Sequence, residues 1–226
     1  MTRALTLALD ASTHAGTVAL LAGAEELAAS EVAMRNVGRE TLLPAIVELL
    51  RTSEATLENV ARIVCGSGPG SFTGLRIAAS IAKALAFGDG AARIPFYGVS
   101  SLLLIVAGND VARRPGRYVA VLDALRGDMY TEAFEVDEHC AIGEIDGMSV
   151  QPRTHIEAYA ARFGARLVGP DQAGHLTPHA RGVARVEPLI DAGGPADLAT
   201  WEPNYGRAAE AQVRWEQAHG RPLFTR

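Results

Sequence analysis

Short apolar runs separated by small polar connectors make up the beginning of the chain. Residues 4–10 and 16–22 are two such runs, joined by Ala-Ser-Thr-His-Ala, a connector of the length found in hairpins. A third run, residues 26–33, follows the turn-like sequence Ala-Gly-Ala. This pattern predicts a meander of three antiparallel strands.

Helical periodicity begins after the meander. Leucine and isoleucine recur at spacings of three, four and seven across residues 39–52, which predicts a helix with Pro44 near its start, where proline is tolerated. The other elements predicted for the first half are a buried strand at 62–65, a helix at 73–87, a strand at 94–99 and a helix at 101–107 with Ser100 as its N-cap. The first half therefore has the order β-β-β-α-β-α-β-α.

A polar stretch divides the chain into two halves. Residues 108–116 contain Pro-Gly and lack periodicity, so we place a domain boundary there. The expected units are an N-terminal lobe at 1–108 and a shortened C-terminal lobe at 109–226.

The second half begins the same plan again. A strand at 118–122 ends at Asp123, and a second strand at 129–136 follows a short turn, which matches the strand, aspartate, connector and strand of the first half. Beyond them we expect a helix at 154–163, a strand at 165–168 and a last helix near 208–219. The predicted fold class is α/β with a duplicated architecture.

The composition is that of a globular protein without a general affinity for nucleic acid. Of the 226 residues, 48% are hydrophobic and 21% are charged, which excludes disorder and collagen. The 21 Lys and Arg against 26 Asp and Glu give a net charge of −5, which excludes the overall positive potential of an autonomous nucleic-acid binder. Any RNA contact must then be local or shared with a partner.

Cysteines and apolar runs indicate the compartment. Cys65 and Cys140 lie far apart and outside any metal-ligand spacing, so they indicate neither a disulfide framework nor a zinc site. The first apolar run is interrupted by Asp10 and is short for a signal peptide. No stretch approaches the roughly 20 apolar residues of a membrane span. We therefore expect a cytoplasmic protein that does not bind membranes.

The densest motif is a glycine-rich sequence between a predicted strand and a predicted helix. It runs Gly66-Ser-Gly-Pro-Gly-Ser-Phe-Thr-Gly-Leu-Arg76 and places many backbone N–H groups at a helix start, where an anion could bind. It lacks the Gly-Lys-Ser/Thr ending of a P-loop and the third glycine of a dinucleotide motif, and Lys83 lies well along the following helix. A structural turn is favoured over a phosphate cradle.

The helix after this motif is apolar almost all round. Its polar positions are Arg76, Ser80 and Lys83, and its alanines would let another backbone approach closely. Such a helix must be covered on more than one side. The cover is either the rest of its own domain or a helix of another chain, and the residues alone favour neither.

Two aspartates end matching strands of the two halves. Asp10, followed by Ser12 and Thr13, ends the first strand, and Asp123 ends its counterpart. Two carboxylates facing one cleft would suit Mg²⁺ and a nucleotide, which supports an ATP- and Mg-dependent enzyme of the sugar-kinase type as the alternative function. Against this, Asp and Ser at turns more often bond their own backbone.

The histidines give no catalytic or metal motif. His175 and His179 have a metal-ligand spacing, but Pro178 between them argues against a helix and for a surface loop. No Ser or Cys lies in a recognisable nucleophile context.

Several motifs are shared with a known family. The most specific is Gly68-Pro-Gly-Ser-Phe-Thr-Gly-Leu-Arg76, and the others are Leu9-Asp-Ala-Ser-Thr13, Tyr97-Gly-Val-Ser-Ser101, Asp123-Ala-Leu-Arg-Gly-Asp-Met-Tyr130 and Pro203-Asn-Tyr-Gly-Arg207. With these motifs the sequence resembles the TsaB (YeaZ) family, bacterial accessory subunits for threonylcarbamoyladenosine synthesis in tRNA. The resemblance implies a two-lobed fold of the actin, Hsp70 and sugar-kinase (ASKHA) type, with duplicated βββαβαβα-type lobes.

The function that the resemblance implies is that of a non-catalytic scaffold. Such a subunit binds and stabilises TsaD, which transfers threonylcarbamoyl to the adenosine next to the anticodon. The other partners implied are TsaE, a small ATPase, and a second copy of the chain in a homodimer, with tRNA met only through the complex.

The resemblance also implies which residues make contacts. Partner contacts are expected at Phe72, Thr73, Leu75, Arg76, Ile77, Ala79, Ser80 and Lys83. No cofactor is expected to bind firmly. If ATP or ADP with Mg²⁺ binds at the partner interface, we expect Asp10, Ser12 and Thr13 to be its contacts.

One stretch departs from the wider superfamily. Its catalytic subunits bind metal through a His-x-x-x-His pair, whereas residues 35–44 contain no histidine, and Gly38 stands where many relatives have one. This argues against metal-dependent transfer by this chain. A metallopeptidase activity, once assigned to the superfamily, is remote because HExxH is absent.

Overall fold

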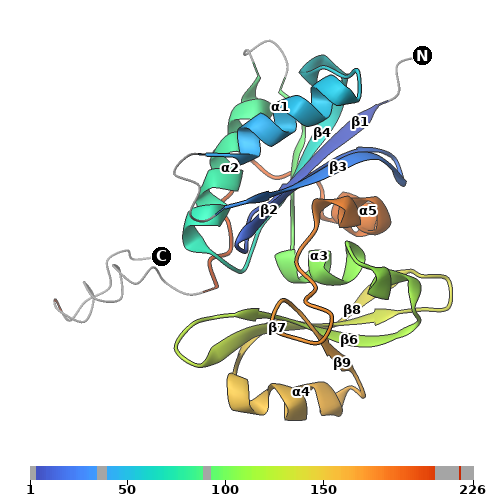
Figure 1. Ribbon diagram of the computed structural model, residues 1–226, viewed down its shortest axis with the longest axis vertical. Helices are drawn as coiled ribbons and strands as arrows, with labels where there is room; N and C mark the ends of the chain where they lie inside the picture. Colours follow the sequence, from blue (N-terminus) through green and yellow to red (C-terminus); the bar gives the residue numbers. More distant parts are fainter. Residues whose placement is uncertain (1–3, 35–39, 89–92, 207–218, 220–226) are drawn as a thin grey trace.

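The computed structural model describes residues 4–34, 40–88, 93–206 and 219, which form two β-sheets separated and flanked by helices (Figure 1). The strands of the first sheet are β1 (Leu5–Asp10), β2 (Ala15–Ala22), β3 (Glu25–Ala33), β4 (Val60–Gly66) and β5 (Phe96–Val99), in the order β3-β2-β1-β4-β5. The meander β1-β2-β3 is antiparallel, and β4 and β5 add to it in parallel.

The second sheet repeats this topology with one strand fewer. Its strands are β6 (Gly116–Asp123), β7 (Asp128–Val136), β8 (Ile142–Pro152) and β9 (Arg166–Val168), in the order β8-β7-β6-β9. Again three antiparallel strands are followed by one that pairs in parallel with the first of them. The predicted α/β fold with two related lobes is therefore confirmed.

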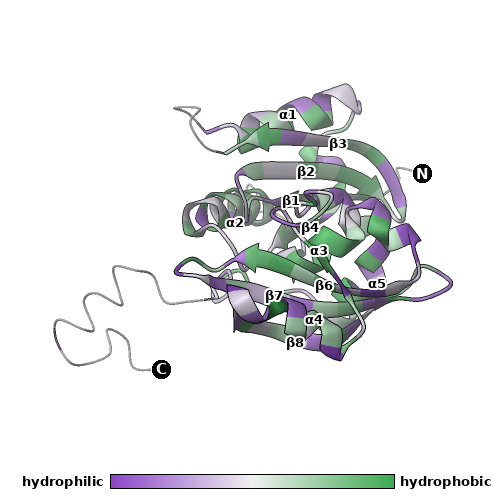
Figure 2. Cartoon of the chain, turned by 60° about the horizontal axis from the view of Figure 1, so that its bottom comes forward, coloured by the Kyte–Doolittle hydropathy of each residue, from purple (hydrophilic) through white to green (hydrophobic). Residues whose placement is uncertain are grey.

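Helices separate and cover the sheets in layers. The helices are α1 (Leu42–Thr52), α2 (Phe72–Phe87), α3 (Ser101–Ala107), α4 (Ile156–Arg162) and α5 (Val183–Gly193). Alternate residues of β1 serve opposite layers: Leu7 packs with α1 and α2, whereas Ala8 belongs to the core around α3 and α5. That central core also contains residues of the second sheet, and α4 covers the sheet's other face. Figure 2 colours α3 and much of β6 as hydrophobic, as this central position requires.

Because β1 and β2 are buried at every position, they have mostly apolar sequences without a polar face, and their few polar residues, Thr6, Asp10 and Thr17, are buried too. All strands and helices predicted for the first half are present. The helix predicted from residue 39 begins at Leu42, where the Glu40 carboxylate accepts the N–H groups of Leu42 and Leu43; residues 35–39 lie outside the described part.

Two elements of the second half were not predicted. β8 carries glycines and acidic residues without apolar alternation, and pairing with β7 makes it a strand. α5 contains Pro188 and has a non-helical residue, Val186, which breaks the periodicity. The helix predicted near 208–219 lies outside the described residues, except for His219.

The chain returns to the first sheet after the second is complete. Arg62 of β4 pairs with Glu187 and with Asp191 of α5, the latter at 2.8 Å. The N–H of Ala196 donates to the carbonyl of Phe96 at 2.8 Å, beside β5. The division at 108/109 stays a prediction. None of the helices in the described ranges is long and apolar enough to cross a membrane.

Candidate functional site

The glycine-rich loop, residues 66–74, is held by a buried aspartate. Asp10 is fully buried; its Oδ1 accepts the N–H and the O–H of Ser12 at 2.9 and 2.7 Å, and its Oδ2 accepts the O–H of Ser101 at 2.6 Å. The Oγ of Ser101 in turn accepts the N–H of Gly68 at 3.1 Å. Burial raises the pKa of Asp10, although these hydrogen bonds lower it. Asp10 thus links the turn after β1, the start of α3 and the loop.

The glycines of the loop are required by close packing. A Cβ at Gly70 would lie 2.3 Å from the carbonyl oxygen of Ser12, and a Cβ at Gly74 would lie 1.9 Å from that of Ala11. Neither distance is possible for a carbon atom, so only glycine lets the turn after β1 approach the start of α2. Packing alone therefore explains these glycines.

Several backbone donors of the loop are used within the chain. The N–H groups of Ser67 and Ser71 donate to the carbonyls of Val99 and Ser12, both at 2.7 Å, and Gly68 donates to Ser101 as described. A phosphate bound here would have to break these bonds. These bonds favour the structural turn that the sequence predicts over a phosphate cradle.

The last described segment of the chain covers the loop and joins it to the second sheet. The N–H of Asn204 donates to the carbonyl of Ser67 at 2.6 Å. The ring of Tyr205 packs on Phe72 with 4.7 Å between centroids, and its carbonyl accepts the O–H of Tyr130, on β7, at 3.1 Å. The Pro203-Asn-Tyr-Gly motif singled out in the sequence therefore closes the junction between the sheets.

A second buried carboxylate holds the start of α3. Glu132 of β7 is 5% exposed, and its Oε2 accepts the O–H of Ser100 at 2.5 Å. Ser100 also caps α3, as predicted, by accepting the N–H of Leu103 at 3.3 Å. Burial raises the pKa of Glu132 to about 7, and the charge of Glu144 adds to the rise. The start of α3 is thus tied to one carboxylate from each sheet.

We expect Glu132 to make the free energy of unfolding depend on pH. Its pKa rises from 4.5 in the unfolded chain to about 7, so between these values the folded protein keeps a proton that the unfolded chain has lost. Stability therefore falls as the pH rises through this window. Replacing Glu132 with Gln should remove about 2.5 kcal/mol of this fall between about pH 5 and about pH 8. Urea unfolding of both proteins at these two pH values measures the difference. The same fall in the variant would show that other groups cause it.

The outward face of α2 carries most of the predicted partner contacts. A surface hollow of about 410 Å³ lies there, lined by Glu40, Phe72, Thr73, Arg76, Ile77, Ser80 and Ile81. Phe72 is 40% exposed, and the guanidinium of Arg76 lies 5.4 Å from its ring centroid.

Three of the predicted contact residues serve the chain itself. Leu75 is fully buried and Ala79 is 6% exposed, because α2 turns a second face to its own sheet, so both side chains pack within the chain and their contact with a partner stays a prediction. Lys83 is half-buried; its ammonium lies 5.8 Å from the ring of Trp201 and 3.7 Å from the Glu202 carboxylate. Partner contact by the outward-facing residues stays a prediction.

Helix α1 extends this face, which sequence reasoning missed. Leu43 and Val47, one turn apart, are 40% and 59% exposed, while Leu42 and Ile46 are buried against the sheet. Glu40, directly before α1, lines the hollow on α2. The sequence of α1 carries a signal for this face, because it has more apolar positions than a single buried face of a helix requires. We call the exposed Leu43, Val47, Phe72 and Ser80, together with the half-buried Ile77 and Ile81, the α1–α2 surface.

The turn after β1 holds the residues predicted to bind a nucleotide. Ser12 is 3% exposed and is bonded to Asp10, and the Thr13 hydroxyl bonds the N–H and the carbonyl of Ala15 at 3.2 Å. These groups are engaged within their own turn. Nucleotide binding there, and ATP or ADP with Mg²⁺ at the partner surface, stay predictions.

Asp123 differs from Asp10 in its surroundings. It is exposed, accepts the N–H of Leu125 at 2.8 Å and lies 3.5 Å from the guanidinium of Arg153. One carboxylate is therefore enclosed and the other is neutralised at the surface. Within the described ranges no three His, Cys, Asp or Glu side chains are grouped so that they could hold a metal ion.

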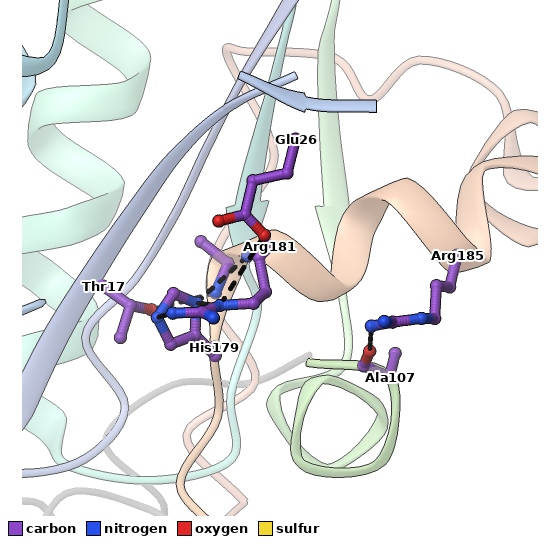
Figure 3. Close-up of polar contacts among 7 residues, drawn as sticks. Thr17, Glu26, Ala107, His179, Arg181 and Arg185 are labelled. Atoms are coloured by element: carbon purple, nitrogen blue, oxygen red, sulfur yellow. Dashed lines mark hydrogen bonds and ion pairs between the residues drawn. The ribbon is translucent and has the colours of Figure 1, made fainter. Parts of the chain in front are cut away.

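His179 lies where the chain returns from the second sheet to the first (Figure 3). It is 6% exposed, and its ring nitrogens lie 2.7 and 3.1 Å from the guanidinium of Arg181. Burial and then the charge of Arg181 lower the pKa of His179 to about 4. His175 is exposed and bonded to the carbonyl of Pro170. The surface-loop prediction is thus confirmed for His175 and wrong for His179.

Comparison with known proteins gives one family and several relatives. The family described as TsaD, tRNA N6-adenosine threonylcarbamoyltransferase, matches residues 31–162. The tRNA threonylcarbamoyladenosine biosynthesis protein TsaB of Escherichia coli is 35% identical over 133 residues, 59% of this chain and 56% of the relative. The protein of the same name from Haemophilus influenzae is 39% identical over 124 residues, 55% and 51% of the two chains. The match spans about half the length of these relatives.

Two solved structures share the whole fold. A Pseudomonas aeruginosa protein described as similar to the peptidase YeaZ has a TM-score of 0.74 and 24% identity, over 90% of this chain and 100% of that one. YeaZ from the same organism has a TM-score of 0.72 and 24% identity, over 89% and 99%. At this identity the likeness shows the fold alone.

Proposed function

Because more than half of the chain matches the family model, the chain belongs to the TsaD family of tRNA N6-adenosine threonylcarbamoyltransferases, and on that premise we propose that it is an accessory subunit in the synthesis of threonylcarbamoyladenosine in tRNA. The resemblance to the TsaB (YeaZ) family is confirmed by curated relatives of that name. In the proposed role the chain binds and stabilises a TsaD-type catalytic subunit and makes no bond itself.

The observation that carries this proposal is the α1–α2 surface. Val47 is 59% and Leu43 40% exposed on α1, beside a hollow on α2 that is lined by Phe72, Ile77 and Ile81. Apolar side chains gathered on neighbouring helices mark a protein interface more often than isolated ones do. Exposed apolar side chains on two neighbouring helices can pack against the helices of a partner. Related lobes in the two subunits would offer each other such helices.

A non-catalytic role is supported by the state of the two aspartates. A metal-bound nucleotide in a sugar-kinase-type reaction needs open carboxylate oxygens. Asp10 is instead enclosed, with hydroxyl groups of Ser12 and Ser101 on its two oxygens. The geometry therefore favours the accessory subunit over the kinase.

Further partners belong to the same proposal. A second copy of the chain would use the α1–α2 surface and so compete with the TsaD-type subunit. TsaE would join the assembled pair, and the complex would act in the cytoplasm.

The test is assembly with the TsaD-type subunit of the same organism. The two purified proteins are mixed and analysed by size-exclusion chromatography with light scattering. We expect a heterodimer to form while any homodimer of this chain disappears. Separate elution of the two proteins at micromolar concentration would overturn the proposal.

A further inference from the structure

Five arginines lie at one end of the second sheet, and we call this group the arginine end. β6 and β9 are parallel and begin at this end, and α4 ends there (Figure 1). Its members, all exposed, are Arg113 and Arg114 before β6, Arg117 in β6, Arg162 at the end of α4 and Arg166 at the start of β9. The turn between β6 and β7 lies at the opposite end of the strands.

Hydrogen bonds connect the segments that carry these arginines. Arg117 donates to the carbonyl of Phe163, directly after α4, at 3.4 Å. Arg166 donates to the Tyr118 hydroxyl at 3.0 Å, and that hydroxyl donates to the carbonyl of Arg114 at 2.8 Å. Two strand starts and one helix end are thereby fixed together as one surface.

Most of these arginines have no ion pair with a described residue. Arg117 lies 3.1 Å from the Glu135 carboxylate. Across the described ranges, the other four arginines have no carboxylate within the 4.0 Å of an ion pair, whereas Arg62, Arg153 and Arg181 elsewhere on the chain each have one. Asp137 and Glu138, in the turn after β7, lie at the same end, so the four guanidinium groups that have no such ion pair, and not the net charge of this end, distinguish the surface.

Two of the guanidinium groups are held against aromatic rings. That of Arg166 lies 5.0 Å from the Tyr118 centroid, and that of Arg162 lies 5.5 and 5.4 Å from those of Tyr159 and Phe163. Stacking of this kind fixes the plane of the group and leaves N–H donors at its edge for a second ligand. A fixed guanidinium fork matches the oxygens of a phosphate.

We propose that the arginine end binds the phosphate backbone of RNA, which under the proposed function is the tRNA being modified. The identity of the RNA rests on that function, whereas the phosphate chemistry rests on the arginines. RNA is favoured over an acidic protein because none of the exposed large hydrophobic side chains in the described part belongs to β6, β9 or α4, and a protein interface needs an apolar centre. The α1–α2 surface lies on the other lobe, so both can be occupied together (Figure 1).

Fluorescence anisotropy of a labelled tRNA transcript with the full chain tests this proposal at several salt concentrations. We expect the triple variant Arg113→Gln, Arg114→Gln, Arg162→Gln to bind at least about tenfold more weakly at low salt. The slope of log K against log salt should fall by about 2, since each phosphate contact contributes about 0.7 to 0.9. Arg153→Gln, at the opposite end of the sheet and ion-paired with Asp123, is the matched control and should bind like the unchanged chain. Equal affinity and slope in the triple variant would overturn the proposal.

Two additional measurements separate the alternatives. In the first, polyglutamate competes with the tRNA at equal total charge. If polyglutamate displaces the tRNA, and if the triple variant binds polyglutamate as weakly as it binds tRNA, the surface is assigned to an acidic protein and the RNA proposal is overturned. Binding of the triple variant to the TsaD-type subunit should be unchanged. If neither the unchanged chain nor the triple variant binds that subunit, while RNA binding still depends on the arginines, the proposed function is wrong and the proposed phosphate-binding site is retained.

Discussion

Replacing Ile77 with Asp is expected to weaken binding to the TsaD-type subunit at least about 100-fold. Ile77 is half-buried, lines the hollow on α2 and belongs to the α1–α2 surface. A carboxylate enclosed there without a partner costs about 3 to 5 kcal/mol, which corresponds to two or more powers of ten in the dissociation constant. Isothermal titration calorimetry of both proteins measures the change.

A matched control and a second variant make this result specific. Ala158→Asp adds the same charge at an exposed position of α4 and should bind like the unchanged chain. Ser80→Asp, fully on the surface of α2, should weaken binding without any effect on folding. If both α2 variants stay folded by circular dichroism and bind normally, the α1–α2 surface is not the interface.

Replacing Gly74 with Ala is expected to destabilise the protein by about 3 kcal/mol, because a side chain enters a space that is already filled. Alanine normally stabilises a helix by about 1 kcal/mol over glycine, so helix propensity alone predicts the opposite sign. At this position the added Cβ would lie 1.9 Å from the carbonyl oxygen of Ala11, and neither backbone can move without displacing the turn after β1. The free energy of unfolding in urea measures the effect.

Gly193 provides the control for this prediction. It also lies in a helix, α5, but a Cβ there would meet no atom within 4 Å. Gly193→Ala should therefore leave stability unchanged or raise it by up to about 1 kcal/mol. A stabilised Gly74→Ala protein would show that α2 does not pack against the turn after β1 as described.

Strands and helices could be predicted from the sequence where burial determines which residue types occupy a segment. β1 and β2 are buried on both faces, so their residues are mostly apolar, with Thr6, Asp10 and Thr17 as buried polar exceptions. Ser100 precedes α3 because the first N–H groups of a helix need an acceptor. β8 lies at the edge of its sheet and is largely exposed, so pairing with β7 rather than its own residues makes it a strand. α5 contains Pro188 and depends on packing against both sheets.

The candidate site was predictable only in part, because its contacts join residues that are distant in the sequence. The hydrogen bond from Ser101 to Asp10 spans 91 positions, and nothing near Asp10 indicates that its second oxygen is already used. Likewise, the apolar sequence of α2 shows that two faces are covered without showing which face the chain covers itself. The sequence therefore does not separate Leu75 and Ala79, which lie on the face that the chain covers itself, from the outward-facing residues of α2.

The most direct test of the account is the modification of tRNA by the TsaD-type subunit, assayed with TsaE and a threonylcarbamoyl donor, with and without this chain. The account predicts that the chain raises the yield of modified adenosine, that Ile77→Asp does not, and that the chain alone modifies no tRNA. Full support by Ile77→Asp, or modification by this chain in the absence of the TsaD-type subunit, would contradict it.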